Sequence, residues 1–191
     1  MSYLRTELSN SSGVERRRAR VALVELGDEA VPTLIAALSD PHLLAKHEAL
    51  KALEAIGNVA AAQGLVDALH DSDYCVRWMA AEALTHTGPT GLRILLAELA
   101  REDELGSEPA YVHEWTRYVL HFYQGDLPKP LEQLLSALDD NGAGDTLAWD
   151  ASVALQSITI TSTTPSSSTS TTSTTSTTSH NFSATASGAC G

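Results

Sequence analysis

The feature that most constrains this chain is an internal repeat of about 30 residues. Three segments align on a glycine at their ends, at Gly27, Gly57 and Gly88. The leucines that share one offset in these segments and in two weaker copies are 30, 31, 36 and 35 residues apart, which is the length of a helix–turn–helix unit. The pairs that carry this offset are Ala22-Leu23, Ala52-Leu53, Ala83-Leu84, Val119-Leu120 and Ala154-Leu155.

A second amphipathic helix alternates with the first, and each copy has a leucine near its end: Leu38, Leu69, Leu99 and Leu138. Apolar residues recur at intervals of three and four in these segments, as a helix with one buried face requires. Aromatic residues make up only 5% of the chain, which favours helices packed through small side chains over sheets. The sequence therefore predicts an all-α fold, an α-solenoid of about five hairpins over residues 1–160.

Turn residues stand where this arrangement needs them. Gly27, Gly57 and Gly88 occupy positions where the end of a helix favours a left-handed residue, and Pro89 follows the last of them. The segments 40–41 and 71–73 contain aspartates that can cap the helix that follows.

The third unit reads Val76-Arg77-Trp78-Met79-Ala80-Ala81-Glu82-Ala83-Leu84. It resembles the Val-Arg-x-x-Ala-Ala-Glu-Ala-Leu pattern of the HEAT-like repeats named after the phycobilisome bilin lyases. The resemblance implies a stack of HEAT-like hairpins whose second helices line the concave side. It implies the fold strongly and the function weakly, because one repeat serves many unrelated tasks.

One connection is longer than the others. The step from Leu99 to Leu120 is 21 residues, against 15 for the equivalent step in the earlier units. The extra length falls in residues 101–112, which predict a polar loop with four carboxylates. Insertions in solenoids collect on one face and often help to bind a partner, and a tolerated surface loop is the alternative.

The net charge of −12 is unevenly distributed. Beyond Leu95 the basic residues are Arg101, Arg117 and Lys129, against twelve carboxylates. An acidic body repels phosphate backbones, so nucleic-acid binding is disfavoured. We find no signal peptide and no apolar run of about 20 residues that would span a bilayer, so we expect a cytoplasmic protein without membrane contact. In that compartment Cys75 and Cys190 are expected to be free thiols.

The composition changes abruptly after Ile160. Residues 161–179 are Ser or Thr at every position except Pro165. Such a segment has little apolar area to offset the entropy of ordering, so residues 161–191 are predicted to form a disordered tail. Removing this tail should leave the thermal stability of the solenoid unchanged.

Equivalent positions of the second helices predict a ridge that could bind a partner. Ten residues before each glycine stand Arg17, His47 and Trp78. An exposed strip of Trp, Met and His rimmed by charge suits a binding hot spot, although Trp78 and Trp115 could instead pack as core. The predicted ridge consists of Arg17, Arg18, His47, Glu48, Trp78, Met79, His113, Glu114 and Trp115, with a basic patch at one end formed by Arg16, Arg17, Arg18 and Arg20.

Two His-Glu pairs suggest a metal site. His47-Glu48 and His113-Glu114 place imidazole and carboxylate side by side, and both are ligands for iron or zinc. The segment 43–57 resembles the His-Glu motif of deoxyhypusine hydroxylase, which is also HEAT-like and binds two irons. That family supplies four pairs, and Trp78-Met79 stand in the unit between the two pairs of this chain. The sequence therefore predicts no metal and no other cofactor.

The leading hypothesis is a non-catalytic module that binds a protein or peptide on the concave ridge, with the basic patch attracting an acidic segment of the partner. A bilin-lyase-like subunit that acts on a tetrapyrrole is the first alternative, and a metal-dependent hydroxylase that uses the His-Glu pairs is the second. The identity of the partner and the oligomeric state are left open.

Overall fold

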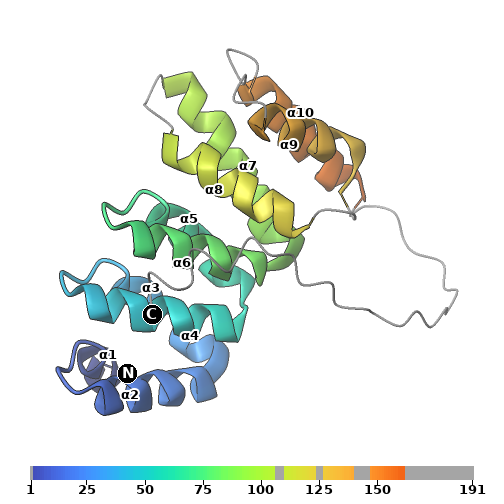
Figure 1. Cartoon of the computed structure of the whole chain (residues 1–191). Helices are drawn as coiled ribbons and strands as arrows, with labels where there is room; N and C mark the ends of the chain where they lie inside the picture. The colour runs from blue at the N-terminus through green and yellow to red at the C-terminus, as the bar shows by residue number, and fades with distance from the viewer. Residues whose placement is uncertain (1, 106–109, 124–126, 140–146, 162–191) are drawn as a thin grey trace, which may run out of the picture.

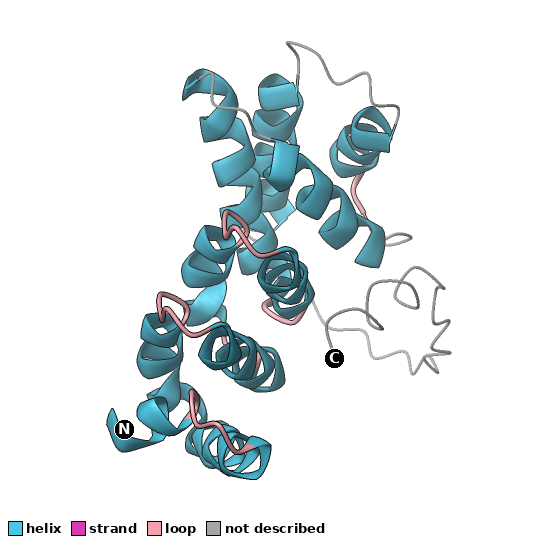
Figure 2. Cartoon of the chain, turned by 60° about the vertical axis from the view of Figure 1, so that its left-hand side comes forward, coloured by secondary structure: helices cyan, strands magenta, loops and turns pink. Residues whose placement is uncertain are grey.

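The structure, a computed structural model, describes residues 2–105, 110–123, 127–139 and 147–161 (Figure 1). All elements in these ranges are helices (Figure 2), which confirms the predicted all-α class. None of the described helices is long and apolar enough to cross a bilayer. In chain order the elements are α1 (Ser2–Glu7), α2 (Gly13–Leu26), η1 (Gly27–Ala30), α3 (Val31–Ala37), α4 (Leu43–Ile56), η2 (Val59–Ala61), α5 (Ala62–Ala68), α6 (Tyr74–Thr85), α7 (Gly88–Leu105), α8 (Ala110–Phe122), α9 (Lys129–Asp139) and α10 (Leu147–Thr161).

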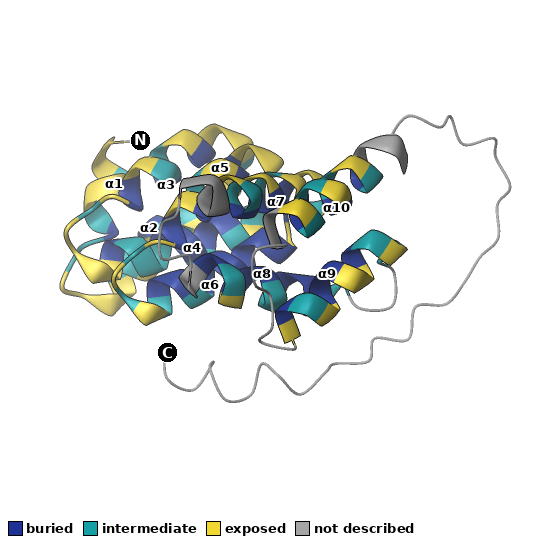
Figure 3. Cartoon of the chain, turned by 90° about the horizontal axis from the view of Figure 1, so that it is seen from above, coloured by how far each residue is buried: buried dark blue, intermediate teal, exposed yellow. Residues whose placement is uncertain are grey.

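Successive hairpins stack into a solenoid with two layers of helices (Figure 3). The first helix of each of the first four hairpins lies in one layer, formed by α1, α3, α5 and α7. The second helices, α2, α4, α6 and α8, pack side by side in the other. We call these the first layer and the second layer. The chain thus forms the α-solenoid that its repeat predicts.

The leucines that define the repeat form the core between the two layers. Leu23, Leu53, Leu84 and Leu120 are all buried, as are Leu38, Leu69, Leu99 and Leu138 of the alternating helices. Alanine side chains of α4 and α6 are buried beside these leucines. Small side chains let neighbouring helices approach closely, and each buried leucine contributes about 2 kcal/mol of apolar transfer free energy.

The fifth hairpin departs from this order. Its first helix, α9, packs against α8, and its second helix, α10, packs against α7. Figure 3 shows α9 continuing the second layer and α10 continuing the first, so the two helices have exchanged layers. The prediction that Ala154-Leu155 repeats the earlier Ala-Leu pairs is therefore wrong: Ala154 is buried against the first layer and Leu155 is only partly buried.

The long connection in the fourth unit also differs from the polar loop that the sequence predicts. Helix α7 runs through Leu105 and has 18 residues, against seven for α3 and for α5. Much of the predicted loop is therefore helical, because residues 97–105 contain no glycine or proline that would end the helix. Residues 106–109 lie outside the described part of the chain.

The three repeat glycines have the backbone angles that the sequence predicts, but they do not all end a helix. Gly27, Gly57 and Gly88 all have positive φ, which glycine adopts without strain. Gly57 is a left-handed C-cap of α4 and Gly27 is the C-cap of α2. Gly88 instead opens α7, since α6 already ends at Thr85, and Pro89 belongs to the first turn of α7.

The turns that lead into the second layer share one hydrogen-bond pattern. Asn10, Asp40 and Asp71 each accept a bond from the backbone N–H two residues later, at Ser12, His42 and Asp73. These side-chain bonds fix the same Asx turn in three successive hairpins. Of the predicted aspartate caps, Asp73 does cap its helix, because its Oδ1 accepts from the N–H groups of Cys75 and Val76.

After the first and third of these Asx turns, an arginine four positions later holds the backbone of the turn. Arg16 Nη1 donates to the carbonyls of Asn10 and Ser11 at 2.7 and 3.1 Å. Arg77 is the equivalent residue and donates to the carbonyls of Asp71 and Ser72 at 2.8 and 3.0 Å. We call this contact the turn clamp. It satisfies carbonyls that the helices leave free, with charge-assisted hydrogen bonds.

Cys75 corrects one expectation, because it is disulfide-bonded in the structure and is not a free thiol. Cys190 and the rest of the predicted tail beyond Thr161 lie outside the described residues.

Candidate functional site

The second layer brings the predicted ridge together on neighbouring helices. Arg17, His47 and Trp78 stand at equivalent positions of α2, α4 and α6, which pack in that order. Continuing the register by the 36 residues that separate Leu84 from Leu120 places Glu114 of α8 in the same row. We call these four residues the ridge row. Arg17 and Glu114 are exposed, and His47 and Trp78 are half-buried.

Three residues of the predicted ridge are displaced from it. Met79 is 4% exposed and Trp115 is 2% exposed, so both belong to the core and neither offers a surface to a partner. The ring of Trp115 packs 5.5 Å from that of Tyr74 on the preceding hairpin, which explains its burial. His113 precedes the ridge row by one position, in register with Arg16 and Arg77 of the turn clamp.

Most arginines of the basic end patch are paired with groups of the same chain. Arg16 clamps its turn, and Arg20 Nε lies 3.3 Å from Glu48 Oε2 on α4. Arg18 pairs with Glu15 at 2.7 Å on the exposed surface of α2. Arg17 is exposed and is the patch residue best placed to meet a partner.

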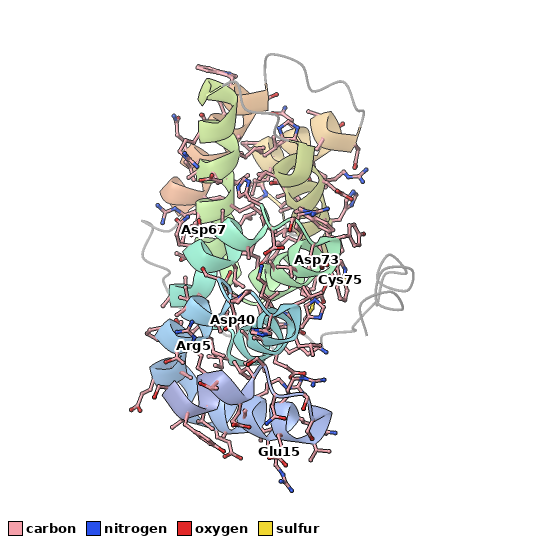
Figure 4. All side chains as sticks on the ribbon, turned by 90° about the vertical axis from the view of Figure 1, so that its left-hand side faces the viewer. Arg5, Glu15, Asp40, Asp67, Asp73 and Cys75 are labelled. Atoms are coloured by element: carbon pink, nitrogen blue, oxygen red, sulfur yellow. The ribbon has the colours of Figure 1, made fainter. Side chains whose placement is uncertain are left out.

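The Glu15–Arg18 pair also marks a difference between the hairpins, because the position of Glu15 is buried in the later ones. The equivalents of Glu15 are Ala45, Val76 and Val112, and all three are buried. Figure 4 shows Glu15 at the end of the molecule formed by α2. Polar residues at these positions cover the N-terminal end of the solenoid, as capping repeats do.

An exposed apolar row lies beside the ridge row and was missed in the sequence. Helices α2, α4 and α6 each begin with large apolar side chains that are exposed: Val14 on α2, Leu43 and Leu44 on α4, and Tyr74 on α6. We call these four residues the apolar row. They stand 13 or 14 residues before the repeat glycines, so the signal was present in the aligned units. Large apolar groups that line up across three repeats outside the core indicate a contact surface.

Figure 4 shows the edge of the solenoid on which this surface begins, with Asp40 and Asp73 on two successive turns. Lys46 Nζ on α4 lies 2.5 Å from Asp71 Oδ2 on the next turn, so an ion pair joins the second and third hairpins at this edge. Burial of Asp71 raises the pKa of its carboxyl group, but the hydrogen bonds from Lys46 and from the backbone of Asp73, together with the charges of Lys46 and Arg77, lower this pKa below its ordinary value. An ion pair between hairpins therefore helps to hold the helices that carry the apolar row.

The His-Glu pairs of the sequence do not form one centre. His47 lies on α4 and His113 on α8, with α6 between them. Glu48 faces Arg20, and the Nε2 of His47 is 4.0 Å from Asp73 Oδ1. Burial lowers the pKa of His47, with Asp73 acting in the opposite direction. Across the described residues, no three His, Cys, Asp or Glu side chains are grouped so that they could hold a metal ion.

Further along the second layer, carboxylates and aromatic rings lie together. Tyr118 on α8 donates its hydroxyl to Glu82 on α6, the residue 36 positions before it. The pKa of Tyr118 is raised well above its ordinary value, chiefly by burial and secondly by this hydrogen bond. Burial and the charge of Glu82 raise the pKa of Glu54 on α4. His86 and Lys51 oppose the shift of Glu54 without cancelling it.

Aromatic side chains border these carboxylates. Trp78 packs partly buried against the core on α6, one turn before Glu82. Phe122 is 59% exposed at the end of α8, and its ring centroid is 6.4 Å from that of His86. We call Glu54, Trp78, Glu82, Tyr118 and Phe122 the aromatic–glutamate patch. It combines two half-buried carboxylates with aromatic side chains, one of which, Tyr118, is hydrogen-bonded to Glu82.

Comparison with known proteins supports the repeat assignment. Residues 1–85 match the family model described as HEAT repeats. No curated protein matches the chain, so the likenesses to bilin lyases and to deoxyhypusine hydroxylase rest on the motifs alone. The matched segment contains the first three hairpins up to the end of α6, which are the most regular part of the stack. The sequence and the stacking of its helices together support a HEAT-like repeat protein.

Proposed function

We propose that this protein is a non-catalytic scaffold that binds a protein or peptide on the second layer of its solenoid. The observation that carries the proposal is the apolar row, in which Val14, Leu43, Leu44 and Tyr74 lie exposed on three successive helices. A monomeric protein seldom leaves large apolar side chains aligned on its surface without a partner for them. The HEAT repeats matched by residues 1–85 are commonly protein-binding scaffolds, which agrees with this role.

The ridge row lies one helical turn from the apolar row and supplies polar contacts. Arg17 stands at one end and Glu114 at the other, with His47 and Trp78 between them. An apolar strip with a polar margin has the composition of an interface. An acidic segment of the partner could still pair with Arg17, although Arg16, Arg18 and Arg20 are engaged within the chain.

A site-specific photo-crosslinker tests this proposal in the full chain. A benzoylphenylalanine at Leu44 should capture the partner, and the same group at Ala36, an exposed residue of α3 in the first layer, should not. Leu44→Ser should also reduce recovery of the captured protein by at least about tenfold, because hot-spot residues dominate binding.

Two results would contradict the proposed surface. One is capture from Ala36 with none from Leu44. The other is unchanged recovery with Leu44→Ser in a chain whose helical circular dichroism is intact.

A further inference from the structure

The aromatic–glutamate patch suggests the chemistry of the partner, on the assumption that the proposed scaffold function is correct. Its residues come from three neighbouring helices of the second layer: Glu54 from α4, Trp78 and Glu82 from α6, and Tyr118 and Phe122 from α8. We propose that this patch binds a basic segment of the partner protein, with an arginine side chain held against the aromatic rings and paired with Glu82 and Glu54.

Charge complementarity favours a basic occupant. Residues 161–191 contain no Asp, Glu, Lys or Arg, so the entire net charge of −12 belongs to residues 1–160. A field of this sign attracts a basic segment and repels an acidic one. Four carboxylates on α4, α6 and α8 are at least partly exposed: Glu48, which pairs with Arg20, and Glu54, Glu82 and Glu114.

The charges of Glu54 and Glu82 also favour a basic occupant. Glu54 and Glu82 are half-buried on neighbouring helices, and each repels the charge of the other. Lys51 and His86 lie near enough to reduce this repulsion, yet the pKa of Glu54 stays raised. A guanidinium group between the two carboxylates would relieve the repulsion, and its hydrogen bonds to carboxylate oxygens would be stronger than those between neutral groups.

The aromatic side chains select arginine over lysine. Phe122 presents an exposed ring on the last turn of α8, and Tyr118 presents its ring edge-on to Trp115, with the centroids 6.2 Å apart. Tyr118 is thereby held in place while its hydroxyl orients Glu82. A planar guanidinium stacks on such rings and donates two parallel hydrogen bonds to one carboxylate, a geometry that an ammonium group does not match.

Fluorescence anisotropy with three labelled peptides tests this inference on the full chain. The probes are twelve-residue peptides that alternate glycine with arginine, with lysine or with glutamate. We expect the arginine probe to bind most tightly, the lysine probe several-fold more weakly, and the glutamate probe most weakly. Glu82→Gln and Glu54→Gln should each weaken the arginine probe by about fivefold to tenfold. Glu25→Gln makes the same charge change at an exposed position of α2, and should alter the affinity for the arginine probe less than twofold.

Melting curves verify that each variant folds, and the outcomes separate the two proposals. Equal weakening by Glu25→Gln and Glu82→Gln would show that only net charge attracts the probe, and would overturn the patch. Preference for the glutamate probe, lost in Arg17→Gln, would also overturn the basic partner but would leave the scaffold function standing. If no probe binds while Leu44 still crosslinks a partner, the inference fails and the scaffold function holds. If Leu44 captures nothing either, both fail.

Discussion

The first four hairpins and the fifth are built from the same kind of helices, yet they stack differently. In the first four, each second helix continues the layer of α2, α4, α6 and α8. In the fifth, α10 crosses to the layer of α7 and α9 takes the place beside α8. The comparison shows that a repeat period determines which helices form, while the side chains at each contact determine where they pack.

The two ends of the solenoid differ accordingly. The N-terminal end is covered by the Glu15–Arg18 ion pair, and later hairpins bury the residues equivalent to Glu15. On α10, Ala151, Ala154 and Ile158 bury one face, and Trp149, which is 72% exposed, lies with Val153 on the opposite face. Thus one end has polar residues in place of a stacking surface, and the described part of the other end has apolar ones.

The largest expected effect tests what keeps the first hairpins regular. Arg77→Met should lower the free energy of unfolding by about 2–3 kcal/mol, because it removes two charge-assisted hydrogen bonds that a buried arginine makes to partly buried carbonyls. Arg16→Met removes the equivalent bonds from a more exposed turn and should cost about 1 kcal/mol or less. Urea titration followed by circular dichroism measures both. Equal losses in the two variants would mean that burial of the turn clamp is unimportant.

A smaller effect tests the exchanged layers. Ala154→Leu should destabilise the chain by about 1–3 kcal/mol, because Ala154 is fully buried on α10, which packs on α7 and α9. Val153→Leu adds one methylene group to the exposed face of the same helix and should change stability by less than about 0.5 kcal/mol. Thermal melts compare the two variants. If Ala154→Leu is tolerated as well as Val153→Leu, α10 does not pack on α7 in the way described.

The smallest effect concerns Glu54, whose pKa is raised in the folded chain above its ordinary value of 4.5. Above the raised pKa the group is charged in both states and the folded state is penalised, so Glu54→Gln should raise the melting temperature slightly there. As pH falls through the raised pKa, the wild-type carboxyl group is protonated and the penalty disappears. The advantage of Glu54→Gln should therefore fade below that pKa and be absent below about pH 4.5.

Melting curves of wild type and Glu54→Gln between pH 4 and pH 8 measure this effect. Glu132→Gln, on the exposed face of α9 in the fifth hairpin, is the matched control and should show no such dependence. An advantage of Glu54→Gln that grows as pH falls would have the wrong sign and would exclude a carboxyl group penalised by burial and by Glu82.

The sequence predicts most of the regular stack. Its leucine period locates the buried positions of α2, α4, α6 and α8, because a helix packed between two neighbours must repeat its apolar face. It does not predict the exchange of α9 and α10, since Ala154 and Leu155 have the same spacing whichever layer receives them. The extension of α7 was missed because charged residues read as a loop also form helix readily.

The candidate site was predicted less well, for a geometric reason. Arg17, His47 and Trp78 do share one row, but Met79 and Trp115 turn toward the core one position later. A shift of one residue rotates a side chain by about 100° around a helix, which separates surface from core. The apolar row could have been found, because its residues precede the repeat glycines at nearly constant distance. The link between Tyr118 and Glu82 required the register of the fourth hairpin, which lacks that glycine.

Hydrogen exchange of the full chain with and without the arginine probe tests most directly whether the second layer of the regular stack is the binding surface. Binding should slow exchange in α4, α6 and α8, and should leave α3, α5 and α10 unchanged. The same experiment with Glu82→Gln should show little protection at equal probe concentration. Protection confined to α10 or to the first layer would contradict the proposed surface, and would place the partner on the end of the solenoid or on its opposite side.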